Sequence, residues 1–380
     1  MASGAENSER GPLRSRTVDR VRAAGGVWRL PAGELRLPRA FGFCRGVEVA
    51  LEMLARAVAD ARGDGKRLFL LGEIIHNPWV NDFFRDRGVR VLTPDERERL
   101  EDLIGPDDCA VIPAFGVPLP VERRLRVIGC EVIDTTCGNV RRLWAWAERA
   151  AEAGRGVLIF GRAMHDETVV TKSRLAAAGG KYVVVGGLDE VDVFCRLIRG
   201  TERQSFADRF DTDHTNTESI EPFLHLAQVS QTTMLYDDTM EVRRRAGEAF
   251  AARFGEQEAK KRLLFEPTVC RATQERQSAA VELCREGLDL AIVVGGFGSS
   301  NTRHLYELAR GHGPAYFIET AEAILSAERV ESYDPQAGET RVTCGWLPER
   351  RPLRIGVLSG ASTPEVLIGQ VLDRLAGMLQ

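Results

Sequence analysis

Three of the eight cysteines share one kind of local sequence, and this shared placement is the strongest chemical signal in the chain. Cys44, Cys137 and Cys270 each follow a short apolar run of strand type and precede a stretch with helical periodicity. We therefore expect each thiol at the carboxyl end of a strand and the start of a helix, the edge of an open α/β sheet where ligands bind. Three thiolates around one centre would suit a soft metal or an iron–sulfur cluster, and would leave one iron of a four-iron cluster open to substrate.

A simpler interpretation stays open for each of these cysteines taken singly, because a cysteine at the end of a strand is usually a small buried hydrophobe. The context that the three share favours the ligand interpretation for the set. The remaining cysteines lack this context, and we interpret them as core or incidental thiols. They are Cys109, Cys130, Cys195, Cys284 and Cys344.

Two histidines and one acid also lie where predicted strands end. His76 and Asn77 follow one strand, and His165 and Glu167 follow another. Two imidazoles and a carboxylate in such places could hold an anion and transfer protons, although a solvated loop is the ordinary position for a single histidine. The other histidines lie in polar or helical context and are predicted to be surface residues. They are His214, His225, His304 and His312.

Short hydroxyl and amide side chains gather at three predicted helix starts. The free backbone N–H groups and the dipole of a helix start form an anion site when such side chains add their own donors. An ordinary N-cap is the alternative at each start taken alone. Three such starts together with two histidines predict a phosphate or diphosphate ligand, and the lack of a Walker A or GxGxxG pattern argues against a nucleotide. The residues are Thr232 and Thr233, Ser299, Ser300 and Asn301, and Ser362 and Thr363.

Strand-like and helix-like segments alternate along the chain, which predicts βαβ units with parallel sheets. Apolar, β-branched runs predict buried strands within 66–75, 109–115, 131–136, 156–162, 181–187, 288–297, 314–319 and 353–360. Apolar residues at helical spacing predict amphipathic helices within 47–61, 140–154, 239–255, 277–287 and 302–313.

The three cysteine segments indicate a weak internal repeat, and we predict three small α/β domains around a central cleft, each of which supplies one cysteine. A disordered N-terminal arm is expected over 1–33. The first domain is expected over 34–137, and the strand before Cys44 could pack with the third domain. The second is expected over 138–269 with an insertion near 201–222, and the third over 270–380.

The composition limits the classes of partner. The net charge is −4 without a basic block, so nucleic acid is not expected as a partner. No apolar run approaches the roughly 20 residues that a membrane span needs, and cysteines without a CxxC pattern do not indicate a disulfide scaffold. A cytoplasmic location is expected. A plastid location would require residues 1–30 to be a transit peptide, which Glu6, Glu9 and Asp19 oppose.

Nine segments, taken together in this order, resemble the LytB (IspH) family of 4-hydroxy-3-methylbut-2-enyl diphosphate reductases, and most closely its longer plant and cyanobacterial subgroup. They run from about residue 36 to the C-terminus. They are GFCRGVEVAL, GEIIHNPWVN, AFGV, DTTCGNVRRLW, HDETVVT, SQTTM, CRATQERQ, VVGGFGSSNTRHL and SGASTPEVLI.

The resemblance implies an oxidoreductase with a trefoil of three α/β domains around one oxygen-sensitive 4Fe–4S cluster per chain. Cys44, Cys137 and Cys270 fall on the ligand positions, and Glu167 falls on the proton-donor position and would act through Thr232. The implied reaction converts 4-hydroxy-3-methylbut-2-enyl diphosphate to isopentenyl and dimethylallyl diphosphate, the last step of the methylerythritol phosphate route to isoprenoids, with electrons from ferredoxin or flavodoxin. The implied substrate-binding residues are His76, His165, Thr232, Ser299, Ser300, Asn301 and Ser362.

The chain departs from the family pattern in a few places. Phe115 stands where shorter bacterial members carry histidine, and Gly138 and Asn139 follow the second cysteine where proline is usual. Glycine frees the backbone that proline fixes, so a looser loop is expected there. Arg45 adds positive charge beside the first cysteine, which could raise the potential of a cluster.

Two alternatives stay open beside the reductase. One is a related iron–sulfur reductase that acts on another hydroxylated substrate, an interpretation supported by Gly138 and Arg45. The other is a non-catalytic metal-binding or redox-sensing protein, although a sensor would have no need of Glu167 and Thr232, and structural zinc normally takes four protein ligands. The sequence leaves the oligomeric state open.

Overall fold

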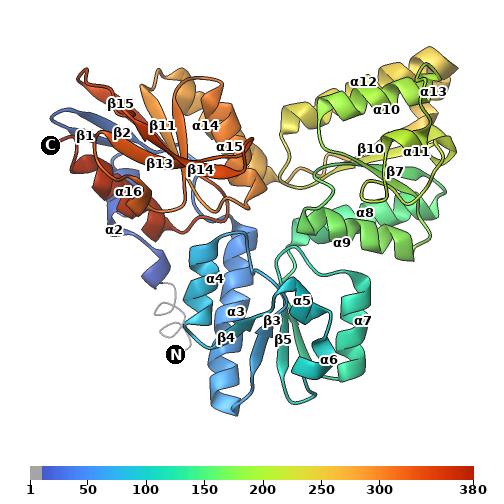
Figure 1. The fold of residues 1–380 in the computed structure, drawn as a ribbon, viewed down its shortest axis with the longest axis horizontal. Helices are drawn as coiled ribbons and strands as arrows, with labels where there is room; N and C mark the ends of the chain where they lie inside the picture. Colours follow the sequence, from blue (N-terminus) through green and yellow to red (C-terminus); the bar gives the residue numbers. More distant parts are fainter. Residues whose placement is uncertain (1–10) are drawn as a thin grey trace. The chain divides into compact units, whose positions relative to one another are not determined.

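The structure is a computed structural model that describes residues 11–380, and it divides into two compact units. The first unit comprises Met1–Val58, Glu73–Val89 and Arg271–Gln380. The second unit comprises Ala59–Gly72 and Arg90–Cys270. Figure 1 labels the helices and strands of both units.

The first unit is built on a five-stranded sheet in the order β1-β2-β15-β11-β12. The strands from β2 to β12 run parallel, and β1 pairs antiparallel with β2 at the edge. All five residues of β11 are buried, as expected for a β-branched strand covered on both faces. The strands are β1 (Val27–Leu30), β2 (Gly33–Arg36), β15 (Leu353–Ser359), β11 (Leu290–Val294) and β12 (Ala315–Ile318).

Helices cover both faces of this sheet (Figure 1). Ile292 of β11 packs with side chains of α2 and α16, and Val293 packs with side chains of α14 and α15. The alternation follows from the period-two geometry of a strand, which sends neighbouring side chains to opposite faces. The helices are α2 (Arg16–Ala23), α4 (Pro78–Arg85), α14 (Arg271–Arg285), α15 (Ser300–Arg310) and α16 (Glu365–Ala376), and α3 (Arg45–Asp64) begins in this unit. The remaining elements are η1 (Gly11–Leu13), η3 (Ala321–Ala323) and the hairpin of β13 (Arg329–Asp334) and β14 (Glu339–Cys344).

The second unit contains two further sheets, in the orders β10-β9-β7-β8 and β4-β3-β5-β6. The first of these is entirely parallel, and β3, β5 and β6 of the other also run parallel. The strands are β10 (Leu263–Phe265), β9 (Leu226–Ser230), β7 (Gly156–Phe160), β8 (Tyr182–Val185), β4 (Val89–Val91), β3 (Leu68–Leu70), β5 (Cys109–Ile112) and β6 (Glu131–Asp134).

The β7 sheet is covered on both faces by helices, as Figure 1 shows. Val157 and Ile159 pack with side chains of α8 and α9, whereas Leu158 and Phe160 pack with side chains of α10 and α12. The helices are α5 (Pro94–Arg97), α6 (Leu100–Leu103), α7 (Leu119–Ile128), α8 (Gly138–Glu152), α9 (Asp166–Ala177), α10 (Leu188–Arg199), α11 (Phe206–Arg209), α12 (Tyr236–Phe254) and α13 (Glu256–Arg262), with η2 (Glu221–Leu224).

Each predicted strand and helix is present, and the predicted α/β class with parallel sheets is confirmed. Several elements were not predicted, among them β9, the neighbour of β7, and the β13–β14 hairpin. Among the described residues, no helix is long and apolar enough to cross a membrane.

The prediction of a disordered arm over 1–33 is wrong for residues 11–33, which form η1, α2 and the start of the β1–β2 pair. Val18 and Val21 are buried with side chains of α16, and the Ser15 hydroxyl caps α2 by accepting a bond from Val18 N at 3.3 Å. The arginine-rich composition gave no clear helical pattern. Two apolar residues on one face are nevertheless enough to pack this eight-residue helix against the core. Residues 1–10 lie outside the described part of the chain.

The polar insertion near 201–222 is ordered around aromatic side chains. Phe206 stacks on Phe223 with ring centroids 5.3 Å apart, and Phe194 packs edge-on against Phe223. Buried aromatic pairs of this kind order a segment that has no regular periodicity. The remaining domain boundaries stay a prediction.

Candidate active site

The three cysteines with the shared sequence context lie directly before helices. Cys44 precedes α3, Cys137 is the N-cap of α8, and Cys270 precedes α14. The predicted placement of the thiols between a strand and a helix is therefore confirmed. All three residues are partly exposed.

The backbone N–H of each of these cysteines donates to a carbonyl in a loop that follows a strand of its own unit. Cys44 N donates to Ala361 O at 3.2 Å, after β15. Cys137 N donates to Ala114 O at 2.8 Å, after β5, and Cys270 N donates to Thr232 O at 3.0 Å, after β9. Each cysteine is thus fixed at the carboxyl edge of a parallel sheet.

The other cysteines differ in their surroundings. Burial raises the pKa of Cys109 to about 12 and of Cys195 to about 11, and it also raises the pKa of Cys284 and Cys130. A thiol that stays protonated is a poor metal ligand. Cys109, Cys195 and Cys284 are core residues, as predicted, and Cys344 is exposed.

Glu167 is the second residue of α9 and is 3% exposed. Its carboxylate accepts two bonds from one residue: Thr232 N donates to Oε1 at 2.6 Å, and Thr232 Oγ1 donates to Oε2 at 2.6 Å. Bonds to a charged acceptor are short and strong, so the carboxylate is held in a single orientation. Because the carbonyl of Thr232 also accepts from Cys270 N, one residue joins the acid to a predicted cluster ligand within the second unit.

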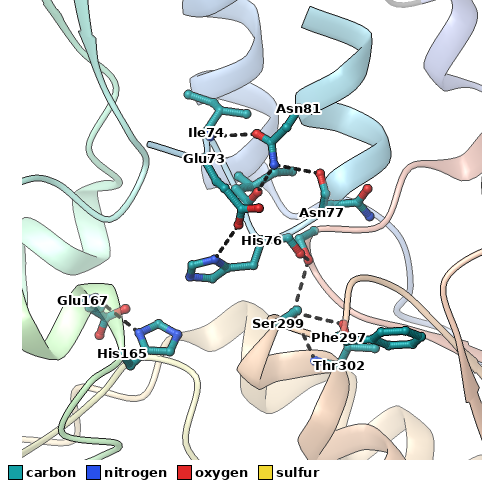
Figure 2. Close-up of polar contacts among 12 residues, drawn as sticks. Glu73, Ile74, His76, Asn77, Asn81, His165, Glu167, Phe297, Ser299 and Thr302 are labelled. Carbon is teal, nitrogen blue, oxygen red and sulfur yellow. Dashed lines mark hydrogen bonds and ion pairs between the residues drawn. The ribbon is translucent and has the colours of Figure 1, made fainter. Parts of the chain in front are cut away.

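His165 is the N-cap of α9, and its Nδ1 accepts a bond from Glu167 N at 3.2 Å (Figure 2). An imidazole nitrogen that accepts is unprotonated, so the cap fixes the tautomer of the ring. His165 and Glu167 therefore lie together at one helix start after β7, and the sequence predicted them to follow a strand.

His76 lies in the loop before α4 in the first unit. Its Nδ1 lies 3.1 Å from Oε2 of Glu73 and must donate, since an ionised carboxylate only accepts. Asn81 braces this loop: its Oδ1 accepts from Ile74 N at 3.0 Å, and its Nδ2 donates to Ile75 O at 3.0 Å. Figure 2 shows the Glu73 carboxylate beside the ring and Asn81 among the loop's backbone groups.

The start of α15 brings the predicted serines together. Ser299 is the N-cap and accepts from Thr302 N at 3.3 Å, and Ser362 Oγ lies 3.2 Å from Ser299 Oγ and donates to His76 O at 3.4 Å. The loop must approach closely here, because a Cβ on Gly296 would lie 2.5 Å from His76 O. Ser299, Ser362 and the His76 backbone thus form one cluster in the first unit.

Ser300 and Asn301 are buried at the same helix start. Ser300 Oγ is buried and has no hydrogen-bond partner among the described residues. Leaving a buried hydroxyl unsatisfied is costly, so such a group indicates a place for a polar ligand. Asn301 Oδ1 accepts from Ala361 N at 3.0 Å, which links α15 to the loop that also binds Cys44 N.

Some predicted groups have structural roles instead. Thr233 Oγ1 accepts from Gln231 Nε2 at 2.7 Å, and Thr363 Oγ1 donates to Val294 O at 2.9 Å, so these hydroxyls hold loops in place. His304 was predicted to be a surface residue, but it is 8% exposed. Its place on the inner face of α15 explains the error, since helical context alone does not tell which face is covered.

Sequence reasoning missed Glu73, Asn81 and Arg276. Glu73 and Asn81 flank the histidine in the motif GEIIHNPWVN. Their separations from it are short enough for the start of one helix to bring all three residues together, so their roles could have been inferred. Arg276 is 5% exposed and donates to Gly42 O at 2.7 Å. No local pattern marks that contact, because 234 residues separate its two partners.

Two of the departures from the family pattern, Gly138 and Arg45, have ordinary geometry. Gly138 begins α8 without a positive φ, and a Cβ at this position would meet nothing within 4 Å. Cys137 is the N-cap of α8 with an extended backbone, φ −60° and ψ 137°, and the expectation of a looser loop stays a prediction. Arg45 lies 3.2 Å from Glu52 and 3.5 Å from Glu48, so acidic neighbours balance its charge.

The first unit carries Cys44, and the second carries Cys137 and Cys270. Across residues 11–380, no three His, Cys, Asp or Glu side chains gather closely enough to hold a metal ion.

Comparison with known proteins gives the family. Residues 35–376 match the family model described as LytB protein. The chain belongs to this family. Relatives named 4-hydroxy-3-methylbut-2-enyl diphosphate reductase occur in Thermosynechococcus vestitus (33% identical, covering 96% of this chain and 90% of the relative) and Gloeothece citriformis (34% identical, covering 98% and 91%).

Two solved structures also match the LytB chain. One is a (E)-4-hydroxy-3-methyl-but-2-enyl diphosphate reductase described as the terminal enzyme of the non-mevalonate pathway, with TM-score 0.55, 26% identity and coverage of 90% of this chain and 99% of that one. The other is a reductase from Plasmodium falciparum, with TM-score 0.63, 22% identity and coverage of 90% and 87%. Both confirm the predicted fold class.

Members of the LytB family use an iron–sulfur cluster, and the donor set of this chain fits such a group. Cys44, Cys137 and Cys270 are partly exposed thiols at helix starts with fixed backbones. Of the other cysteines, Cys109, Cys195 and Cys284 are buried, Cys130 is partly buried, and burial raises the pKa of all four. Cys344 is exposed on the β13–β14 hairpin. Cysteine sulfur is the usual ligand of iron–sulfur clusters, so accessible thiols on fixed backbones suit such a group.

Proposed function

We propose that this protein is an oxidoreductase that removes the hydroxyl of 4-hydroxy-3-methylbut-2-enyl diphosphate and gives isopentenyl and dimethylallyl diphosphate. The reaction takes two electrons and two protons, breaks one C–O bond, forms one C–H bond and releases water. It would be the last step of the methylerythritol phosphate route. The observation that carries the proposal is the bonded series from Glu167 through Thr232 to Cys270, which joins a buried acid to a cluster ligand.

Cys44, Cys137 and Cys270 would hold one 4Fe–4S cluster per chain. When bound, the cluster would supply electrons and one open iron position for the hydroxyl oxygen of the substrate. The thiolates suit this task because each has a backbone fixed by a bond to a loop carbonyl, so little ordering is left for the moment of binding.

Glu167 would supply the protons through Thr232. In the described geometry the Thr232 hydroxyl donates to the carboxylate at 2.6 Å. Protonation of Glu167 reverses this bond, because a carboxylic acid donates, and the proton of the hydroxyl is then free to pass to the departing oxygen. Because Glu167 is held in one orientation and bonds to the Thr232 hydroxyl, it is suited to deliver a proton to one defined atom.

Residues of the first unit would bind the diphosphate. The buried Ser300 hydroxyl, the Asn301 amide and the Ser299–Ser362 pair lie at one helix start, where backbone N–H groups also favour an anion. His76, oriented by Glu73, would add a further donor. His165 of the second unit would contact the substrate beside Glu167.

The electrons would come from ferredoxin or flavodoxin, and the protein would act in the cytoplasm. The two other candidate functions have less support. Gly138 and Arg45 were the basis for a different substrate, and both have ordinary surroundings. A sensor without turnover would have no use for the bidentate Glu167–Thr232 pair.

The proposal is tested by an anaerobic assay of the reconstituted protein with the hydroxylated diphosphate and a reduced viologen. Products are identified by mass. Formation of both five-carbon diphosphates is the expected result. A protein with a full complement of iron that leaves the substrate unchanged would contradict the proposal, and a parallel test of other allylic alcohols would then identify the substrate class.

A further inference from the structure

The segment that carries Cys44 has no regular structure of its own. Between the end of β2 at Arg36 and the start of α3 at Arg45, the chain forms neither helix nor strand. Its conformation therefore depends on bonds to other segments, since no ladder or helical repeat fixes it. This loop is called the Cys44 loop below.

Among the bonds that hold the Cys44 loop within the first unit, three connect its residues 42–44 to β15, to the loop after β15 and to α14. Gly42 N donates to Ser359 Oγ at 2.9 Å, and Cys44 N donates to Ala361 O at 3.2 Å. The third bond is made by Arg276, whose Nη2 donates to Gly42 O at 2.7 Å. Gly42 has φ +67°, a conformation that glycine adopts easily and that leaves both of its peptide groups facing these partners.

Arg276 is the one charged side chain among these three contacts, and it lies in the middle of α14. The residue is 5% exposed, and Nη1 also donates to Ala272 O in the preceding turn at 2.9 Å. Burial of a guanidinium costs free energy unless hydrogen bonds compensate it, so an apolar side chain would fill this position at a lower cost if only packing were required. The fixed contact with Gly42 is two residues from the thiol.

A second path joins the same loop to the substrate-binding residues of the first unit. Ala361 accepts from Cys44 N through its carbonyl and donates through its own N–H to Asn301 Oδ1 at 3.0 Å. Asn301 Nδ2 in turn donates to Thr273 Oγ1 of α14 at 3.4 Å. Helix α14 therefore supports the Cys44 loop directly through Arg276 and indirectly through Thr273.

We infer that Arg276 is a positioning residue for the cluster: it holds the Cys44 loop in its ligating conformation before the cluster binds. The inference rests on the proposed assignment of Cys44 as a ligand. A charged donor contributes more than a neutral one to a local bond, and preorganised ligands lower the cost of binding. Helix α14 begins at the residue after Cys270, so one helix starts at one ligand and fixes the loop of another.

The test compares three variants of the full-length protein: Arg276→Met, Arg276→Lys and the matched control Arg285→Met, which changes an exposed arginine on the same helix. Hydrogen exchange of the cluster-free protein reports on the Cys44 loop. We expect Arg276→Met to speed exchange at residues 41–46 about tenfold or more, because the loop loses a charge-assisted bond. Exchange in α8 should not change, and Arg285→Met should match the wild type.

Iron content after reconstitution gives the second measurement. Arg276→Met should retain less iron per chain than the wild type, and its reduced cluster should have an altered EPR signal. Arg276→Lys keeps a charged donor and should restore part of both the exchange protection and the iron content. Unchanged exchange at 41–46, faster exchange spread evenly over the chain, or full iron content in Arg276→Met would each overturn the inference.

These measurements do not depend on the reaction. If the wild type binds iron while Arg276→Met exchanges rapidly at 41–46 and retains less iron, the inference holds even when no product forms. If wild-type protein makes both products while Arg276→Met retains its iron and its protection, the proposed function holds and the inference fails.

Discussion

The two units carry polar groups of different kinds, and they hold these groups in different ways. In the second unit the central group is ionisable: Glu167 is buried and receives two bonds of 2.6 Å from one threonine. In the first unit the central groups are neutral: Ser299, Ser362 and Asn301 lie at helix and loop starts and are held by bonds of 3.0 Å to 3.3 Å.

The difference follows from what each group must do. A residue that gives up a proton has to keep one geometry while its charge changes, so a bidentate partner on a rigid loop is needed. Residues that bind an anion need only present donors, and neutral hydroxyls and amides do so without the cost of burying a charge. We therefore assign substrate binding mainly to the first unit and proton delivery to the second.

The largest effect is expected from the cluster ligands. Cys137→Ser should abolish nearly all iron binding, because serine is a much weaker ligand for iron–sulfur clusters than thiolate. The exposed Cys344→Ser serves as control and should bind iron as the wild type does. Iron analysis and the brown absorbance of the reconstituted protein measure both; normal absorbance in Cys137→Ser would remove this residue from the ligand set.

Glu167→Gln should retain the cluster and lose turnover by about a hundredfold or more, the usual contribution of a general acid. Glutamine keeps the shape and can still accept from Thr232, but it cannot supply a proton. Substrate affinity should change little, because binding is assigned to the other unit. Steady-state kinetics with a viologen donor separate kcat from KM, and a wild-type kcat would remove Glu167 from the mechanism.

Ser300→Ala should raise KM about tenfold while kcat changes less, since a bond to a charged ligand is lost. The unliganded protein should not be destabilised, because the buried Ser300 hydroxyl has no partner among the described residues. Thermal unfolding without substrate measures the second point. An unchanged KM together with a lower Tm would instead assign this serine to the fold alone.

Ser299→Ala, at the neighbouring position, should affect stability more than KM. This serine caps α15 and contacts Ser362, so its loss should lower stability by about 1 kcal/mol. The effect on KM should be smaller than that of Ser300→Ala. Chemical denaturation measures the change in free energy of unfolding, and equal effects of the two variants on KM would contradict the distinction.

Gly138→Pro should have the smallest effect and should be stabilising, by about 0.4–1 kcal/mol. Proline suits the first position of a helix, a Cβ there meets no atom within 4 Å, and the extended backbone of Cys137 is compatible with a following proline. Denaturant midpoints measure the change. A clear loss of stability would mean that the N–H of Gly138 has a structural role.

Much of this arrangement could be predicted from the sequence, because local patterns determine it. Apolar runs followed by helical periodicity placed Cys44, Cys137 and Cys270 before helices, and the apolar run of β7 placed His165 and Glu167 after a strand. These features depend on a few neighbouring residues, so the pattern and the structure agree.

Features that depend on distant partners could not be predicted in the same way. Thr233 and Thr363 carry the same hydroxyl as Thr232, yet they bond to nearby loops, and only the packing decides which of them faces a carboxylate. Arg276 and Gly42 meet across 234 residues. The helix α2 was not predicted because its overall hydropathy is low and only two valines, Val18 and Val21, form its buried face.

The central claim, that the two units serve different steps, is tested most directly by the double variant Glu167→Gln/Ser300→Ala beside its two single variants. Product formed anaerobically from the hydroxylated diphosphate is quantified by mass, and kcat/KM is compared in a double-mutant cycle. Independent roles predict that the double loss equals the product of the single losses within about twofold. A double variant no worse than Glu167→Gln alone would contradict the division, because both residues would then act in one step.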